Sequence, residues 1–327
     1  MHVRGAMSDR SAGGATGLGC SGHPHTACVS TTDGGRAGAT EERTYDLKGE
    51  PVSVQLKCRS DLNDHSVEDA TGTRPTEPRI SVVIPALNEA ESLPFVLEKI
   101  PLDLHEVVLV DGRSDDGTID AARRSWSGIS IVRQQGSGKG DALRTGFAAA
   151  TGDIIVALDA DGSTDPTEIP AFVGALCAGA DFAKGSRFLQ GAGTSDMPVH
   201  RKLGNRAFVI LVRLIMGGRY TDLCYGYNAF WRDVLPKLNL DSDGFEIEAL
   251  MNIRVLKAGL KVVEVASFES RRLNGVAKLR TFADGWRVLM TILHESAGFS
   301  KPRSVVSSPQ AGAYSKDGRS PSTRRNE

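Results

Sequence analysis

The fold of this chain is decided by the stretch Ile154-Ile-Val-Ala-Leu-Asp-Ala-Asp161, which Gly162-Ser-Thr-Asp-Pro166 continues. Five apolar residues lead directly into two carboxylates that stand one residue apart. A short apolar run of this kind is typical of a strand buried on both faces of a parallel sheet. Because side chains alternate along a strand, we expect Asp159 and Asp161 on the same side of its carboxyl end. Ligands of open α/β sheets bind at that edge.

The Asp159–Asp161 pair predicts a metal ion. Two carboxylates this close repel each other unless a cation lies between them. A hard divalent ion with oxygen ligands, Mg²⁺ or Mn²⁺, fits such a pair and usually also holds substrate phosphates. Asp-x-Asp alone is a weak motif, because a polar strand end can carry two aspartates without any ligand. The metal interpretation therefore depends on the rest of the chain.

Strands and helices alternate around this stretch. The predicted strands are 80–84, 106–110, 129–132, 154–158 and 181–188, and the predicted helices are 93–100, 118–126, 141–150 and 167–177. Such alternation gives βαβ units and a mainly parallel sheet. Polar residues recur where the strands end, so we expect them to converge on one crevice at the edge of the sheet.

Composition divides the 327 residues into three parts. Residues 1–76 and 302–327 are polar and rich in small residues, which predicts disordered extensions on either side of a folded unit at 77–301. Val52–Leu56 alternates and predicts one short strand within the first extension. The formal net charge of −1 gives no basic field of the kind that nucleic acid attracts.

Nothing in the sequence predicts a membrane span or a secreted protein. No run of apolar residues is long enough to cross a bilayer, and the first residues lack the apolar core of a signal peptide. The five cysteines have no metal-site spacing. They predict reduced thiols in a cytosolic protein.

The glycine-rich loop Gln135-Gly-Ser-Gly-Lys-Gly140 fits neither of the common phosphate motifs. A P-loop needs Ser or Thr after its lysine, and a dinucleotide fingerprint follows the first strand and ends in a third glycine. What remains is a glycine-rich backbone with one cation, Lys139, near the predicted crevice. That combination suits a diphosphate, but an ordinary glycine-rich loop accounts for it nearly as well.

Four motifs follow one another along the chain: Val83-Ile-Pro-Ala-Leu-Asn-Glu89, Val110-Asp-Gly-Arg-Ser-Asp-Asp-Gly-Thr118, Gly138-Lys-Gly-Asp-Ala-Leu143 and Asp159-Ala-Asp161. As an ordered set they resemble the family 2 glycosyltransferases, which have the GT-A fold, a Rossmann-like α/β architecture. Within that family the chain looks like the dolichyl- and polyprenyl-phosphate sugar synthases, such as the mannose synthases. Gly185-Ser-Arg-Phe188 and Arg272-Leu-Asn-Gly-Val-Ala-Lys-Leu279 carry this closer resemblance.

The resemblance implies roles by position. On the donor side it assigns the base and ribose to Pro85, Leu87 and Glu89, the nucleotide to Asp111, and the metal and diphosphate to Asp159 and Asp161. Cations for the donor diphosphate or an acceptor phosphate would be Lys139, Arg187, Arg272 and Lys278. The chain departs from the family pattern at Leu87, where an aromatic ring is common, at Gly112, and at Ser163, where the synthases often have glutamine.

The second half of the chain is expected to face the acceptor. Residues 200–217 form a basic amphipathic pattern and residues 282–293 an apolar one, which predicts either two core-packed helices or peripheral contact with a membrane. An acceptor hydroxyl needs a general base, for which Asp222 and Glu246 are the candidates. An acceptor phosphate is already anionic and needs only cations.

These observations predict an inverting, metal-dependent glycosyltransferase of the cytoplasm, in peripheral contact with the inner face of the membrane. It would move a sugar from a GDP- or UDP-sugar to a polyprenyl phosphate. Three alternatives stay open: transfer to a hydroxyl of a saccharide or small molecule, a nucleotidyltransferase, and a catalytically degenerate nucleotide-sugar-binding module.

Overall fold

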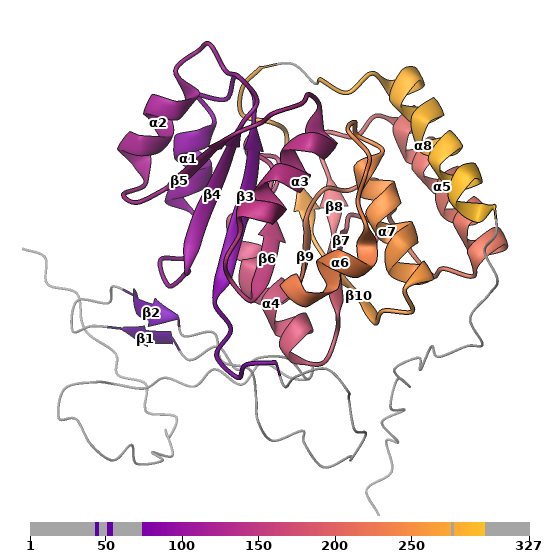
Figure 1. The fold of residues 1–327 in the computed structure, drawn as a ribbon, viewed down its shortest axis with the longest axis horizontal. Helices are drawn as coiled ribbons and strands as arrows, with labels where there is room; N and C mark the ends of the chain where they lie inside the picture. Colours follow the sequence, from indigo (N-terminus) through magenta and orange to yellow (C-terminus); the bar gives the residue numbers. More distant parts are fainter. Residues whose placement is uncertain (1–42, 46–50, 55–73, 276–277, 298–327) are drawn as a thin grey trace, which may run out of the picture.

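A seven-stranded sheet forms the centre of the computed structural model, which describes residues 43–45, 51–54, 74–275 and 278–297 (Figure 1). The strand order is β10-β7-β9-β6-β3-β4-β5. The strands are β3 (Ile80–Ala86), β4 (Glu106–Asp111), β5 (Ser130–Arg133), β6 (Ile154–Ala157), β7 (Phe182–Ser186), β9 (Asn228–Trp231) and β10 (Val262–Ala266). Strand β9 runs antiparallel to both of its neighbours, and every other pair is parallel. The predicted mainly parallel α/β fold is confirmed.

Helices connect the parallel strands, as the alternating pattern predicts. They are α1 (Leu93–Glu98), α2 (Thr118–Ser125), α3 (Lys139–Ala149) and α4 (Ile169–Cys177), the last preceded by the 3₁₀ turn η2 (Pro166–Glu168). Helix α3 packs on β3 and β4, and α4 packs on β7, β9 and β10. The two faces of the sheet are therefore covered, and the edge formed by the carboxyl ends of the parallel strands stays accessible.

The core is built around β6, the strand that precedes Asp159 and Asp161. Its four residues are all buried, and Ile154, Ile155 and Val156 have no exposed surface. Pairing with β3 on one side and β9 on the other gives β6 neighbours along both edges. A fully buried Val or Ile side chain contributes about 1.5–3 kcal/mol, so this strand holds the carboxylates that follow it on a rigid support.

A second group of elements lies beyond the sheet. It comprises the short strands β8 (Gly193–Thr194) and β11 (Phe268–Glu269), the 3₁₀ turn η3 (Arg232–Val234), and the helices α5 (Val199–Met216), α6 (Leu235–Leu238), α7 (Ile247–Lys257) and α8 (Thr281–Ser296). Figure 1 shows α5 and α8 side by side at one end of the molecule. Their inner faces share a small apolar cluster with α7, which includes Val212, Ile253 and Ile292. Both helices match the expected ranges.

The predicted extensions lie largely outside the described residues. Within the first one, β1 (Arg43–Tyr45) and β2 (Pro51–Val54) form a two-stranded antiparallel sheet, and Arg74 pairs with Asp181 and Asp233, so ordered contacts begin before residue 77. Cys224 has a free thiol, as the prediction of reduced thiols expects for it. None of the helices in the described part of the chain has the length and apolar character that crossing a bilayer requires.

Candidate functional site

A cavity of about 580 Å³ opens at the carboxyl edge of the sheet and continues between α5 and α8. Nine of the twelve predicted site residues line it: Pro85, Leu87, Glu89, Lys139, Asp159, Asp161, Arg187, Arg272 and Lys278. The other three, Asp111, Asp222 and Glu246, do not. The convergence expected from the strand ends is therefore present, and the three exceptions need physical reasons.

The two aspartates after β6 are each held by a cation. Lys139 Nζ lies 2.8 Å from Asp159 Oδ1, and Arg272 Nη2 lies 3.3 Å from Asp161 Oδ2. The other oxygen of Asp161 accepts a hydrogen bond of 2.9 Å from the Ser163 N–H, which fixes its side chain. Positive charge is therefore concentrated on this pair, as expected for carboxylates whose mutual repulsion needs a counterion.

Lys139 bridges two carboxylates at the start of α3. Its Nζ also lies 2.6 Å from Glu248 Oε1, on the first turn of α7. Burial disfavours the ammonium, but the charges of Asp159 and Glu248 outweigh it and keep the pKa of Lys139 above its usual range. Burial raises the pKa of Glu248, an effect that Lys139 offsets in part. The lysine is therefore charged and held in place.

The glycines around Lys139 serve packing of the backbone. A Cβ at Gly138 would lie 2.3 Å from the Asp243 carbonyl oxygen, and one at Gly140 would lie 2.2 Å from the Ser242 carbonyl oxygen. The Gly140 N–H donates to the Asp243 carbonyl at 2.8 Å. The loop before α7 therefore packs directly against the backbone at the start of α3. In the glycine-rich segment, Lys139 is the side chain that faces the cavity.

The predicted base and ribose end is closed by a contact between distant segments. Lys278 Nζ donates to the Leu87 carbonyl and lies 2.9 Å from Glu89 Oε1. Asp111 lies beneath this end and is fully buried. Its carboxylate accepts from the N–H groups of Arg113 and Ser114 at 3.2 and 3.1 Å, so it shapes the loop after β4 and does not face the cavity.

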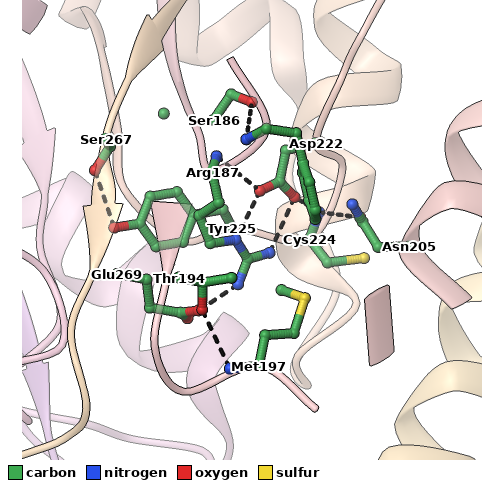
Figure 2. Close-up of polar contacts among 12 residues, drawn as sticks. Ser186, Arg187, Thr194, Met197, Asn205, Asp222, Cys224, Tyr225, Ser267 and Glu269 are labelled. Atoms are coloured by element: carbon green, nitrogen blue, oxygen red, sulfur yellow. Dashed lines mark hydrogen bonds and ion pairs between the residues drawn. The ribbon is translucent and has the colours of Figure 1, made fainter. Parts of the chain in front are cut away.

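Arg187 lies in the middle of a buried charge cluster (Figure 2). Its guanidinium is bidentate to Asp222, at 2.7 and 3.0 Å, and its Nη1 lies 2.9 Å from Glu269 Oε1. It also lies over the Tyr225 ring at 4.6 Å from the centroid. The expectation of a cation free for phosphate needs correction, because two carboxylates already neutralise Arg187.

Asp222 does not fit the predicted role of general base. Its side chain has no exposed surface. Burial works against its charge, but Arg187 outweighs burial and keeps the pKa of Asp222 below its usual range. A base must reach the proton that it removes. Asp222 instead orients Arg187.

Glu246 does not fit that role either. It accepts from Ser242 Oγ at 2.7 Å and from the Gly244 N–H at 3.1 Å, so it holds the loop before α7. The carboxylate of this segment that lines the cavity is Glu248, which the sequence analysis missed. Residues two apart on a helix are rotated by about 200° around its axis, so they lie on nearly opposite faces. Only the exact position and orientation of α7 could therefore distinguish the two glutamates.

The part of the cavity between α5 and α8 has a different character. Its lining includes Met197, Phe208 and Val288, together with Gly204 and Gly285 on the two facing helices. Nothing lies within 4 Å of a Cβ placed at either glycine, so both leave open space. His200, Arg201 and Asp284 line it as well, so this is a partly apolar channel in which two missing side chains leave room for a bulky group.

One polar side chain that lines this channel has a donor without a hydrogen-bond partner. Asn205 is 4% exposed, and its Oδ1 accepts from the N–H groups of Leu223 and Cys224 at 3.1 and 3.2 Å. These two bonds fix the amide, and its Nδ2 has no hydrogen-bond partner in the described part of the chain. A buried unpaired donor is costly. Asn205 is therefore available to an anionic group that enters between Arg187 and α5.

The comparisons agree with this architecture. The sheet, the carboxylates at its edge and the cavity define a GT-A type enzyme, and residues 81–238 match the model of glycosyl transferase family 2. The chain is also 32% identical, over 65% of its length and 84% of the relative, to a polyprenol monophosphomannose synthase of Mycolicibacterium smegmatis. The chain belongs to glycosyl transferase family 2, and the predicted family and enzyme class are confirmed.

Two further relatives show the breadth of the similarity. An undecaprenyl-phosphate mannosyltransferase of Micrococcus luteus is 33% identical over 60% of this chain and 85% of the relative. The crystal structure of glucosyl-3-phosphoglycerate synthase from Mycobacterium tuberculosis, in complex with Mn²⁺, UDP and glucosyl-3-phosphoglycerate, superposes with a TM-score of 0.55. It is 26% identical, and the match covers 69% of this chain and 82% of that one.

Proposed function

We propose that this enzyme transfers a sugar, with inversion, from a nucleoside diphosphate sugar to a polyprenyl phosphate. The observation that carries the proposal is the two-part cavity, which joins a charged edge of the sheet to a partly apolar channel between α5 and α8. A nucleoside diphosphate needs cations, and an isoprenoid chain needs an apolar surface. The relatives named for polyprenol and undecaprenyl phosphate support the same acceptor class.

The residues present fit a divalent ion at Asp159 and Asp161. Both carboxylates border the cavity, and each is paired with a side-chain cation, which indicates that the pair requires positive charge. The described residues contain no group of three or more metal-type side chains, so phosphate oxygens of the donor would complete the shell. Bound there, Mg²⁺ or Mn²⁺ would neutralise the charge of the departing nucleoside diphosphate.

The chain's own groups would then divide the work. Leu87 and Glu89 would hold the base and ribose, and Lys139, Arg272 and Lys278 would supply positive charge along the diphosphate. The unpaired Nδ2 of Asn205 would orient the acceptor phosphate at the entrance of the channel. Because a phosphate is already anionic, its attack on the anomeric carbon needs no base.

Helices α5 and α8 would carry the enzyme to its lipid substrate. Their outer faces expose large apolar side chains at helical spacing: Val199, Leu203, Ile210 and Leu214 on α5, and Phe282, Trp286, Met290 and Leu293 on α8. Arginine and lysine residues accompany these stripes on α5. Apolar stripes flanked by basic residues are typical of helices that lie in the interface of an anionic membrane. We place the enzyme in the cytoplasm, in peripheral contact with the membrane.

A second candidate function is transfer to a phosphorylated small molecule that offers a hydroxyl. The likeness to glucosyl-3-phosphoglycerate synthase favours it. Such an acceptor would need a base, and Glu248 is a cavity carboxylate that could serve. The apolar channel argues against this candidate, because a small polar acceptor would leave it empty.

The deciding test is release of nucleoside diphosphate from a panel of UDP- and GDP-sugars with Mn²⁺ or Mg²⁺, with and without a short polyprenyl phosphate. We expect turnover to require both the lipid phosphate and the metal. Turnover with phosphoglycerate and not with the lipid would establish the second candidate. Metal-dependent binding of a donor without turnover on any acceptor would favour a binding module and contradict both.

A further inference from the structure

The candidate metal ligands are already engaged by cations of the protein itself. Lys139 Nζ is 2.8 Å from Asp159 Oδ1, a hydrogen-bonding distance that leaves that oxygen committed to the lysine. An ammonium and a divalent ion compete for the same lone pairs of a carboxylate. A metal that binds Asp159 through Oδ1, or through both oxygens, displaces Lys139 from this contact, and one that binds through Oδ2 alone still has the ammonium beside it.

Glu248 offers Lys139 a second acceptor in the same place. Its Oε1 lies 2.6 Å from Lys139 Nζ, and the residue is 5% exposed. The backbone at Gly226 closes the space around the three groups: a Cβ there would lie 2.6 Å from Glu248 Oε1, 2.8 Å from Lys139 Nζ and 3.3 Å from Asp159 Oδ2. Lys139 can therefore leave Asp159 without leaving the site and without becoming an unpaired buried charge.

We propose that Glu248 is a positioning residue that acts through Lys139 and thereby sets the affinity of the Asp159–Asp161 pair for a divalent metal ion. When the metal takes Asp159, the ammonium stays on Glu248. Without Glu248, the lysine has Asp159 as its main acceptor and resists displacement. This inference rests on the proposed metal dependence, and it assigns Glu248 a role beyond the family motifs in the sequence.

Binding of Mn²⁺ tests the proposal independently of turnover. Mn²⁺ is titrated into the full chain in the presence of UDP and, separately, of GDP, and the free ion is followed by electron paramagnetic resonance. We expect Glu248→Gln to weaken Mn²⁺ binding about tenfold, the effect of a lost charge–charge contact of about 1.4 kcal/mol. We expect Lys139→Met to strengthen it, because the competing cation is gone.

The double variant separates positioning from simple charge. If Glu248 acts through Lys139, Glu248→Gln has little further effect in the Lys139→Met background, and the two changes are non-additive. An equal weakening in both backgrounds would mean that Glu248 attracts the metal directly, and would overturn the proposal. Thermal melting checks that each variant is folded.

A matched variant keeps the test decisive if Lys139→Met does not fold. Glu269 also lines the cavity, but its ion-pair partner is Arg187. Glu248→Gln should weaken Mn²⁺ binding clearly more than Glu269→Gln does, and an equal effect would overturn the proposal. If the wild-type chain binds no Mn²⁺ with either nucleotide, the proposed metal dependence fails together with this inference. If it binds Mn²⁺ and Glu248→Gln changes nothing, only this inference fails.

Discussion

The two ends of the cavity are built in opposite ways. At the donor end, charged side chains follow the ends of buried strands, and ion pairs link them across short distances. At the acceptor end, two helices that are distant in the sequence face each other across two glycines and an unpaired amide. In the proposed function, the sheet fixes the groups that hold the nucleoside diphosphate sugar, and the open space between α5 and α8 receives the acceptor.

The largest effect should come from breaking the donor end. We expect Asp161→Ala to lower turnover by about 10³-fold or more, because it removes a carboxylate of the proposed metal site and, with the metal, the positive charge that would neutralise the diphosphate. Release of nucleoside diphosphate measures this loss. Asp120→Ala, an exposed position on α2, serves as the control and should retain activity. Retained turnover in Asp161→Ala would contradict the proposed metal site.

The next effect concerns the ion pair that joins the two ends. Asp222→Asn leaves Arg187 without its bidentate partner in a buried site, which should cost about 3 kcal/mol of the free energy of unfolding. Denaturant unfolding measures it. Asp233→Asn is the matched control, because its partner Arg74 and Asp233 itself are partly exposed and such pairs contribute about 0–1 kcal/mol. Equal losses in both variants would show that the Arg187 pair has no special structural role.

Acid should reduce the difference between wild type and Asp222→Asn. The pKa of Asp222 is lowered in the folded protein, so its contribution is present above the usual pKa of an aspartate, about 3.9, and is lost as the pH falls through the lowered value. We expect the free energies of unfolding of the two proteins to converge as the pH is lowered from about 6 to about 3. Denaturant unfolding at several pH values measures this. A difference that grows in acid would have the wrong sign.

A change at the acceptor end should affect one substrate and not the other. We expect Gly285→Leu to lower kcat/KM for polyprenyl phosphate about tenfold. The leucine would fill open space in the channel, and the isoprenoid chain would lose the apolar contact that it makes there. The KM for the donor should stay the same, and it is the internal control. A rise in the donor KM instead would mean that the two ends are not independent.

The smallest effect is expected on the outer surface of the acceptor end. Trp286 and Leu293 are 62% and 43% exposed, and neither lines the cavity. Replacing both with serine should weaken binding to anionic vesicles several-fold, since about 0.025 kcal/mol is lost per Å² of apolar contact. Sedimentation with vesicles measures it, and Phe95→Ser on α1 is the control. Equal effects in both variants would exclude a membrane face formed by α5 and α8.

The donor end was largely predictable from sequence, for a physical reason. A buried strand followed by Asp159 and Asp161 is a local signal, and the rule that parallel strands end at one edge places the other polar residues beside it. Strand β9 was missed, because four residues inserted antiparallel between β6 and β7 gain their place from long-range pairing. No local pattern in Asn228–Trp231 carries that information.

Burial and direction explain the other misses. Asp222 and Glu246 are predicted as bases because they are acidic and lie in the half of the chain that is expected to face the acceptor. Sequence does not distinguish a carboxylate that pairs with a buried arginine from one that lines a cavity. Glu248 was overlooked although it stands two residues from Glu246. The glycine-rich backbone near Lys139 suits a diphosphate when only the sequence is considered. In the structure, Gly138 and Gly140 lack a Cβ because the loop before α7 packs against them.

The position of β9 also bears on how the chain is made. Strand β6 pairs with β9, and β9 in turn pairs with β7, so the two strands that precede it in the sequence have no direct ladder between them. During synthesis, β7 emerges before both of its neighbours, β9 and β10, so the sheet formed by β5, β4, β3 and β6 ends in an open edge and β7 stays unpaired until Asn228–Trp231 emerges. Open edges invite pairing with other chains. A chain ending at residue 227 should therefore aggregate in a translation assay, whereas the full chain should not. The last third of the sequence thus completes the sheet that the first two thirds begin.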